Sequence, residues 1–265
     1  MTSALACVGL SVRDEAELSS LVTRAWRTVR ETGVYGGVHV GRWQDASGAV
    51  LILGWRSGEL VDFVPAYAAA SGGLLSECRL INDFVAVAEV VDAGGQQVTA
   101  TAFEAEQYRQ LLALGRRVSG PARITALGVD VQVYPDADAF AASPGSQLDP
   151  SADPAGPPPR DREQGWPGPP RLAAESFISY GIFADPAQAR PHACLSGTVL
   201  SAGRRVCALT GQPFTAAAVR TAGFEADVCL AGSAYPHLPA PGTIISGTVV
   251  LSAAIDAPLP HGQVS

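Results

Sequence analysis

The stretch ACLSGTVLSAGRRV, residues 193–206, shows the two-residue alternation of a half-buried strand. After the turn LTGQPF, the run Phe214–Leu230 breaks at Gly223 and predicts two further strands that meet at a Gly-marked turn. The segment TIISGTVVLSAAI, which ends at Ile255, predicts a long strand that bends at Gly247. This part of the chain is therefore expected to form four or five consecutive strands.

Glycines lie inside the first and the last of these strands, where they allow strongly coiled strands to turn the corners of a small closed or nearly closed sheet. The order is a long first strand with an internal glycine, a TG turn, a hairpin, a loop and a closing strand. This order is similar to that of an OB-fold. The resemblance covers about a quarter of the chain and implies a small C-terminal β-barrel. An SH3-like or sandwich arrangement fits the same pattern.

Composition and charge exclude several classes of protein. With 265 residues, of which 47% are hydrophobic and 16% charged, the chain can bury a core and is not disordered throughout. The net charge of −7 argues against a general nucleic-acid binder, because phosphate contacts need a basic surface. No run approaches the ~20 apolar residues of a membrane helix, and residues 1–10 lack a basic leader. Five widely spaced cysteines do not resemble a secreted disulfide framework, so the expected location is the cytoplasm.

The N-terminal part begins with the pattern of a helix. From about Val12 to Glu31, apolar residues recur at three- and four-residue steps and form one stripe, and Ser11 can cap the first turn. After Gly33, the segments VHVGRW, AVLILGW and ELVDFVP are separated by turns and predict a three-stranded meander. A helix followed by a meander is typical of an α+β module.

Three further elements are expected in this part. The run FVAVAEVV is apolar on both phases, which is typical of a central strand. Thr101, followed three residues later by Glu104, predicts a capping box and hence a helix over 102–114. The segments ARITA and VDVQVYP then predict two strands that are joined at Gly128.

Proline and polar residues dominate 143–172, which has too few apolar residues to offset the entropy of ordering it. We interpret this segment as a linker, with a Pro-rich recognition segment as the alternative. The chain then divides into an α+β module with an N-terminal amphipathic helix (1–142), the linker, an OB-like module (173–257) and a tail (258–265). The fold class is α+β and strand-rich, with a β-module on each side of the linker.

The two β-modules share short strings in the same order. VVDAG and ITALGVDVQV in the first resemble VLSAG and VRTAGFEADV in the second, which makes Gly128 equivalent to Gly223. An internal duplication with a helix inserted into the first copy is one explanation. Chance matches in a chain rich in Val, Ala and Gly are the other.

Signatures of catalysis and of bound cofactors are missing from the sequence. It contains no Gly-x-Ser-x-Gly elbow and no Cys–His arrangement with an orienting acid. His192 and Cys194 are two residues apart, but no second ligand pair follows at zinc spacing, so no metal and no cofactor is expected. Cys207 and Cys229 are interpreted as small core residues, with a redox pair as the alternative. We therefore favour a protein that is not an enzyme.

Aromatic and charged side chains are the candidates for ligand binding. Trp43, Trp55 and Tyr67 concentrate aromatic surface in the meander, where they either pack in the core or line a pocket for a small molecule. Glu89 is a charge in a run that is apolar on both phases, so it needs a partner. It is either half of a buried ion pair that fixes strand register or a catalytic acid. The candidate partners are Arg79, Arg42 and Arg123.

We therefore expect a non-catalytic intracellular interaction or scaffold protein, which acts through β-module surfaces on a protein partner or on a second copy of itself. The first alternative is a small-molecule-binding β-barrel protein or enzyme that uses the aromatic pocket. The second is single-stranded nucleic-acid binding by the C-terminal module through Arg204, Arg205 and Arg220. The acidic net charge makes a nucleic-acid partner the weaker hypothesis, and no membrane partner is expected.

Overall fold

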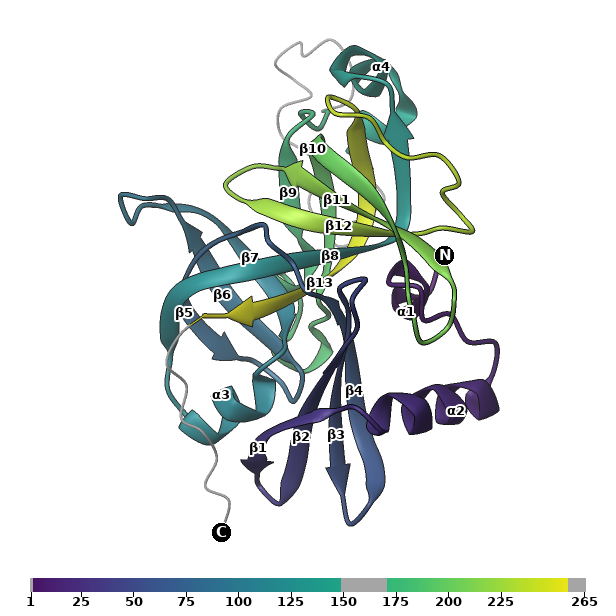
Figure 1. Ribbon diagram of the computed structural model, residues 1–265. Coiled ribbons are helices and arrows are strands. Elements are labelled where there is room, and N and C mark those ends of the chain that lie inside the picture. Colours follow the sequence, from purple (N-terminus) through teal and green to yellow (C-terminus); the bar gives the residue numbers. More distant parts are fainter. Residues whose placement is uncertain (1, 149–170, 257–265) are drawn as a thin grey trace.

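The computed structural model of the chain describes residues 2–148 and 171–256 (Figure 1). Within them, four α-helices cover a framework of β-strands. The helices are α1 (Ala4–Cys7), α2 (Glu15–Trp26), α3 (Tyr108–Leu114) and α4 (Ala137–Ala142). Single 3-10 turns lie at Pro144–Ser146, Tyr180–Ile182 and Pro186–Gln188. The protein is strand-rich, as its alternating sequence segments predict.

The first strands form an antiparallel sheet that we call sheet A. Its order follows the sequence, and the meander expected from VHVGRW, AVLILGW and ELVDFVP is confirmed, with one more strand at its edge. The strands are β1 (Arg30–Tyr35), β2 (Val38–Gln44), β3 (Ala49–Arg56) and β4 (Glu59–Tyr67).

The remaining strands form a second sheet, sheet B, in the order β11-β12-β8-β5-β6-β7-β13-β10-β9. Since β10 also pairs with β11, all of these strands except β9 close into one ring. The strands are β5 (Gly72–Leu80), β6 (Val85–Val91), β7 (Gln97–Ala105), β8 (Val118–Tyr134), β9 (Ser176–Ser179), β10 (His192–Val206), β11 (Pro213–Arg220), β12 (Glu225–Ala231) and β13 (Ile244–Ile255).

A long antiparallel pair, β8 with β13, crosses the ring and divides it. The pairing runs from Ile244 opposite Tyr134 to Ile255 opposite Ala122. On one side β8 and β13 are joined through β5, β6 and β7, and on the other through β12, β11 and β10. Each side is a smaller ring of five strands that uses the central pair as a shared wall (Figure 1).

Apolar side chains fill the ring and the spaces around it as two clusters. One cluster contains inward-facing residues of the ring such as Phe103, Ile124 and Leu251, together with one face of sheet A. The second lies where α1 and α2 meet the other face of sheet A and the outer face of the ring, with Leu21 of α2 and Leu51 of β3 among its members. Sheet A is therefore packed on both faces, against helices on one side and against sheet B on the other.

Helix α2 is shorter than the helix that the apolar stripe predicts from about Val12 to Glu31. The Asp14 carboxylate, and not Ser11, accepts the Glu17 N–H and caps α2. The chain after Trp26 leaves the helix, and the residues from Arg30 onwards form β1. The apolar spacing of a helix continues in the sequence to about Glu31. Helix α2 nevertheless ends earlier, because the residues from Arg30 onwards pair with β2.

The helix expected over 102–114 is wrong in its first half. Thr101 and Glu104 do not form a capping box, because both belong to β7, which pairs with β6 on one side and with β13 on the other. Only Tyr108–Leu114 is helical, and Gly115 ends it in the left-handed conformation as the sequence predicts.

The strand pair expected from ARITA and VDVQVYP is a single strand, β8. Gly128 lies inside β8, whereas Gly223 lies in the turn between β11 and β12, so the two glycines are not equivalent. The internal duplication is not confirmed. The OB-like assignment is not confirmed either, since the C-terminal strands close through β8 from the N-terminal part.

Strands from both sides of the Pro-rich segment build one sheet, whereas the sequence predicts a separate β-module on each side. Residues 149–170 of the expected linker and the tail expected over 258–265 lie outside the described residues. The first described residues of the linker form a 3-10 turn, and Gln147 makes an isolated bridge with Arg171.

Gly247 lies near the start of β13 in the shared wall, opposite Val131 of β8, and is the subject of our first prediction. It has a φ of 144°, and a Cβ at this position would lie 2.3 Å from the Asp130 carbonyl oxygen. We expect Gly247→Ala to lower the free energy of unfolding by about 3 kcal/mol, because backbone strain and overlap add. Chemical denaturation measures this loss.

The matched control is Gly203→Ala in β10, where the nearest atom to an added Cβ is 3.9 Å away. It should change the free energy of unfolding by less than about 0.5 kcal/mol. Equal effects of the two substitutions would contradict the close packing of β13 on β8.

Candidate functional site

Two rows of side chains cross the outer face of the ring on neighbouring strands. In the first, which we call the polar row, Glu104 of β7, Ser252 of β13, Thr125 of β8 and Asp227 of β12 are successive register partners. Register partners point to the same face of a sheet. The cavity row lies beside it and consists of Glu106, Ala254 and Arg123.

One half of the polar row holds the connection between the two sheets. The Asp227 carboxylate accepts the backbone N–H groups of Ala70 and Ser71 at 2.7 and 2.9 Å. The Thr125 hydroxyl donates to the Tyr67 carbonyl at 3.2 Å. The segment from the end of β4 to the start of β5 is therefore fixed on β8 and β12.

The other half of the polar row is not satisfied in this way. The Ser252 hydroxyl is buried and has no hydrogen-bond partner among the described residues. The Glu104 carboxyl, largely buried, makes no ion pair or hydrogen bond with the residues described, and burial raises its pKa to about 7. These two side chains are the polar groups of the row that the fold leaves unpaired.

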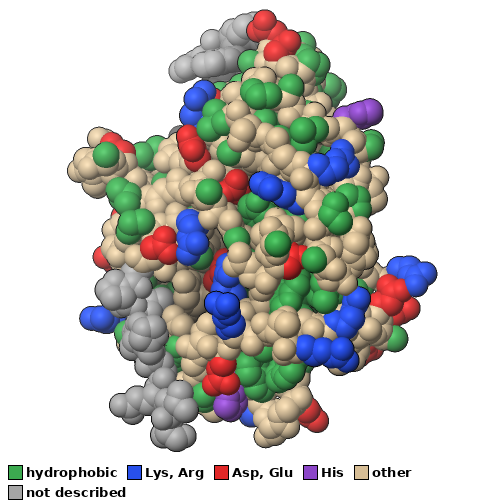
Figure 2. Space-filling model, in the orientation of Figure 1, with side chains coloured by type: hydrophobic (Ala, Val, Ile, Leu, Met, Phe, Trp, Pro, Cys, Tyr) green, Lys and Arg blue, Asp and Glu red, His purple; other side chains and the backbone are tan. Residues whose placement is uncertain are grey.

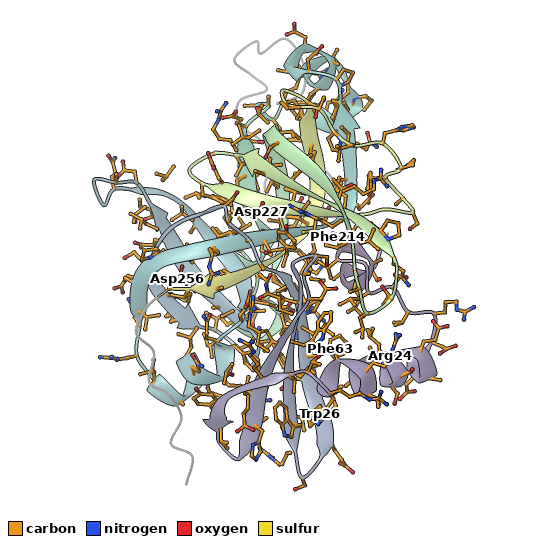
Figure 3. All side chains as sticks on the ribbon, in the orientation of Figure 1. Arg24, Trp26, Phe63, Phe214, Asp227 and Asp256 are labelled. Carbon is orange, nitrogen blue, oxygen red and sulfur yellow. The ribbon has the colours of Figure 1, made fainter. Side chains whose placement is uncertain are left out.

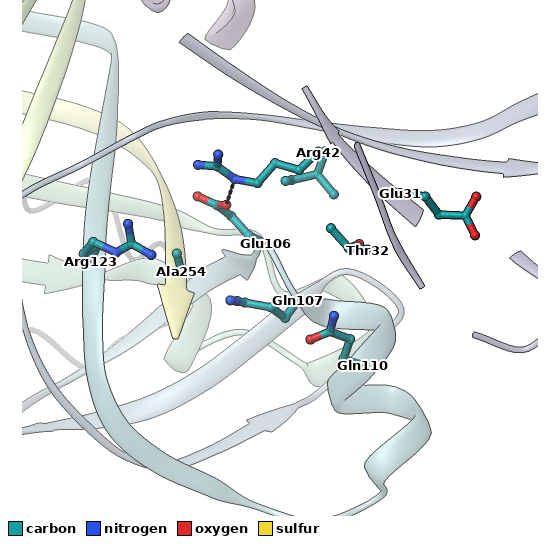
Figure 4. A pocket seen from close by; sticks show the side chains of 9 residues that line it. Glu31, Thr32, Arg42, Glu106, Gln107, Gln110, Arg123 and Ala254 are labelled. Carbon is teal, nitrogen blue, oxygen red and sulfur yellow. Dashed lines mark hydrogen bonds and ion pairs between the residues drawn. The ribbon is translucent and has the colours of Figure 1, made fainter. Parts of the chain in front are cut away.

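A cavity of about 430 Å³ lies between sheet A and the cavity row (Figure 4). Strands β1, β2 and β3 supply one wall, the cavity row supplies the opposite wall, and the start of α3 supplies part of the rim. The lining consists of Glu31, Thr32, Arg42, Ile52, Glu106, Gln107, Gln110, Arg123 and Ala254.

The best-buried charge in this lining is the Glu106 carboxylate, whose side chain is 7% exposed. The Arg42 guanidinium reaches it from sheet A, with 3.1 Å between Arg42 Nε and Glu106 Oε2. Burial raises the pKa of Glu106, and Arg42 and Arg123 act in the opposite direction. Arg42 also donates to the Gln44 side chain, which holds its guanidinium at the cavity.

The far end of the cavity is held by the chain after β13. Arg123 Nη2 lies 3.0 Å from Asp256 Oδ1, and this pair is about half exposed. Asp256 follows directly on β13 and is labelled in Figure 3. The Gln107 amide donates to the Ile255 carbonyl and accepts the Ile255 N–H, both at 3.1 Å, so it is occupied in fixing the strand end.

Three side chains present hydrogen-bond donors to the cavity. Arg42, Arg123 and Gln110 present N–H donors to it, which suit carboxylate and carbonyl oxygens. Its lining contains no serine, cysteine or histidine, and the hydroxyl of Thr32 donates to the Val40 carbonyl at 3.1 Å. The cavity therefore presents two carboxylates but no thiol or imidazole.

The aromatic side chains expected to form a pocket lie elsewhere. Trp43 and Tyr67 are buried in the cluster beneath α1 and α2, and the Tyr67 ring packs edge-on against Phe214. Trp55 is partly buried between Trp26, 4.4 Å away between ring centroids, and His39. None of these three rings lines the cavity between sheet A and the cavity row. The concentration of aromatic residues in the meander therefore reflects packing in the core.

Glu89 and Arg79 line the same cleft, but no hydrogen bond or ion pair joins them. This second cleft, of about 420 Å³, lies on the outer face of β5, β6 and β7, and its ion pair joins Glu77 to Arg117. Glu77 has a φ of 55° at a bulge in β5. The other two partners considered for Glu89, Arg42 and Arg123, line the first cavity and lie beside Glu106 instead.

The three arginines considered for nucleic-acid binding do not gather on one surface, since Arg204 and Arg205 lie near the end of β10 and Arg220 lies in β11 opposite the middle of β10. Arg204 and Arg205 are adjacent in β10 and point to opposite faces, with Arg204 donating to the Pro236 carbonyl. Arg220 lies opposite Thr198, about 20 Å along the strand from Arg204, and pairs with Glu175. On the face shown in Figure 2, arginine and acidic side chains are interspersed.

Sequence reasoning missed Glu106, Gln107 and Gln110, because EAEQYRQ has the composition of a helix surface. A signal was present. Phe103 and Ala105 are apolar while Glu104 and Glu106 are charged, which is the alternation of a strand with one polar face. The expected capping box took precedence over this short pattern.

The described residues contain no cluster of three or more side chains suited to a metal ion, and His192 and Cys194 gain no further ligands there. Cys207 and Cys229 are buried free cysteines. Among the helices of the described residues, none is both long and apolar enough to span a membrane.

Comparisons with protein-family models, curated proteins and solved structures found no match to this chain.

Glu104 generates a prediction about pH. Its pKa is about 7 in the folded chain against an ordinary 4.5, so the folded state holds a proton that the unfolded state releases between these values. The free energy of unfolding should therefore fall as pH rises from 4.5 to 7, by up to about 3 kcal/mol from this group. Glu104→Gln should remove that part of the slope and be more stable than the unchanged chain at pH 8.

Urea unfolding at several pH values between 5 and 8 measures this slope. Glu59→Gln, at an exposed position at the start of β4, is the matched control and should leave the slope unchanged. An equally steep slope in the Glu104 variant would show that this carboxyl is not the group that titrates.

Proposed function

We propose that the protein binds a small polar molecule in the cavity between sheet A and the cavity row. One observation carries the proposal. The ion pair between buried Glu106 and partly buried Arg42 joins the two opposite walls and borders the cavity, where a close-packed interface between the sheets would have enclosed it. Small-molecule sites combine apolar walls with a few polar groups that converge on the ligand.

The donors of the site support the same function. Arg42 and Arg123 each have one carboxylate partner and retain further N–H groups, and Gln110 adds an amide (Figure 4). Ile52 and Ala254 supply apolar contacts on opposite walls. A ligand held between them would contact both sheets and stabilise their packing. The proposed function is binding, and it includes no catalytic step.

A thermal-unfolding screen tests the proposal with monocarboxylates, dicarboxylates, amides, amines and sugars. At least one class should stabilise the chain, by about 2.7 kcal/mol at a concentration 100 times its Kd. Arg123→Gln removes a donor from the cavity and should weaken that ligand about tenfold or more, as expected for the loss of a charge-assisted hydrogen bond.

Arg117→Gln is the matched control, because Arg117 is also exposed and paired with one carboxylate but lines the other cleft. It should leave the affinity unchanged. If no class stabilises the chain, or if both variants weaken binding equally, the cavity is not the binding site.

A second candidate function is self-association, as expected for an interaction protein. Phe183 is 76% exposed in the loop after the turn Tyr180–Ile182. The Asn82 amide donates to the Pro186 and Ala189 carbonyls and so ties this loop to the β5–β6 turn, which carries the exposed Phe84. Two exposed aromatic rings on loops fixed in this way favour a contact surface.

Sedimentation equilibrium tests self-association. The unchanged chain should show a mass that rises with concentration, and Phe183→Ser should abolish the rise because it removes the exposed ring. Leu238→Ser, at another exposed apolar loop position, should not. A monomer at all concentrations would contradict this function.

A further inference from the structure

The charged groups around Glu106 are balanced before any ligand enters. Arg42 and Arg123 carry two positive charges, and Glu106 and Asp256 carry two negative ones. These are the charged groups that act on Glu106 from β2, from β8 and from the end of β13. On the far wall, Glu31 of β1 lies 3.2 Å from His39 Nδ1. The four charges around Glu106 therefore sum to zero, the Glu31 carboxylate lies across the cavity from them and is 43% exposed, and any ligand charge is an addition to this set.

The two carboxylates of this set differ in their access to water. Glu106 is 7% exposed, whereas Asp256 is half exposed. An anion bound at Arg42 would share that guanidinium with a carboxylate that water cannot screen, and like charges in a buried site repel strongly. An anion at Arg123 alone would displace Asp256 into solvent at little expense.

Protonation of Glu106 removes the repulsion. The proton comes from solvent and binds to one carboxyl oxygen, and the neutral acid can donate a hydrogen bond to the incoming anion. Arg42 then becomes available to the ligand as a full positive charge. Burial already favours the neutral form of Glu106, as the raised pKa indicates.

Building on the proposed function, we propose that the ligand is a monocarboxylate and that it enters the cavity together with one proton, which resides on Glu106. The ligand carboxylate lies between Arg42 and Arg123, and the apolar part of the ligand lies along Ile52 and Ala254. One anion and one proton leave the net charge of the site unchanged. A dianion would leave one negative charge uncompensated, because the cavity row contains a single buried carboxyl that can take up a proton, that of Glu106.

Isothermal titration calorimetry with sodium benzoate tests this inference on the unchanged chain. Benzamide and benzylamine have the same ring with a neutral and a positive group, and phthalate is the dianion. Benzoate should bind at least about tenfold more tightly than the other three. Its Kd should rise with pH, approaching tenfold per unit above the pKa of Glu106 in the free protein.

Proton uptake is measured directly by repeating the titration at one pH in phosphate and in Tris, whose ionisation enthalpies differ. The observed heat should change with the buffer in proportion to the protons bound, up to one per benzoate. Glu106→Gln is neutral at every pH, so it should bind benzoate with no uptake and with a Kd that no longer depends on pH. Glu77→Gln, a carboxylate paired with Arg117 outside this cavity, is the control and should behave as the unchanged chain does.

The outcomes separate the inference from the function on which it rests. If benzamide, benzylamine or phthalate binds as well as benzoate, or if uptake persists in Glu106→Gln, the inference is wrong while the binding function stands. If none of the four probes binds and no class of the wider screen stabilises the chain, both are wrong.

Discussion

The pairing of β8 with β13 is the constraint on which the rest of the structure depends. All of β13 pairs with β8, and on its other edge β8 pairs with β5 over its first residues and with β12 in its middle. Neither smaller ring can close without this pair. The outward-facing residues of the same two strands, among them Arg123, Thr125 and Ser252, carry the cavity row and the polar row. The site is thus built on the least replaceable part of the sheet.

The junction of sheet A with the ring explains why polar groups are buried here at all. The chain must pass from β4 to β5 over the outer face of β8 and β12, and its backbone N–H and carbonyl groups need partners there. Asp227 and Thr125 supply them. The same face continues across β13 and β7, where Ser252 and Glu104 meet no such backbone. Glu106, one row away, is partnered by Arg42 from sheet A. The cavity lies beside this contact, where the two sheets do not pack closely against each other.

Short-range alternation was sufficient to predict the strands of sheet A from β2 to β4 and those from β10 to β13. Alternation alone was insufficient for β7 and β8, because pairing with strands distant in the sequence determines the conformation of these segments. Gly128 looks like a turn residue, but β13 on one side and β12 on the other hold it inside β8. Thr101 and Glu104 look like a helix cap, but β6 and β13 take up their backbone groups.

The candidate site was predictable only in part for a related reason. The sequence predicts Arg79, Arg42 or Arg123 as the partner of Glu89. Arg42 and Arg123 do act on a buried carboxylate, but that carboxylate is Glu106. Sequence shows which residue types need partners, whereas sheet register decides which of them meet.

The dimensions of the rings also determine where a ligand can be held. An eight-stranded barrel is only just wide enough for its own side chains, and each ring here has five strands. Their interiors are filled by Phe103, Leu195, Leu251 and their neighbours, none of which is more than marginally exposed. A barrel interior is therefore closed to small molecules in this fold. The cavity lies between the sheets instead, and its polar groups come from both walls, with Arg42 on β2, Arg123 on β8 and Glu106 directly after β7. The proposed binding function therefore uses the space between the sheets and not the interior of a ring.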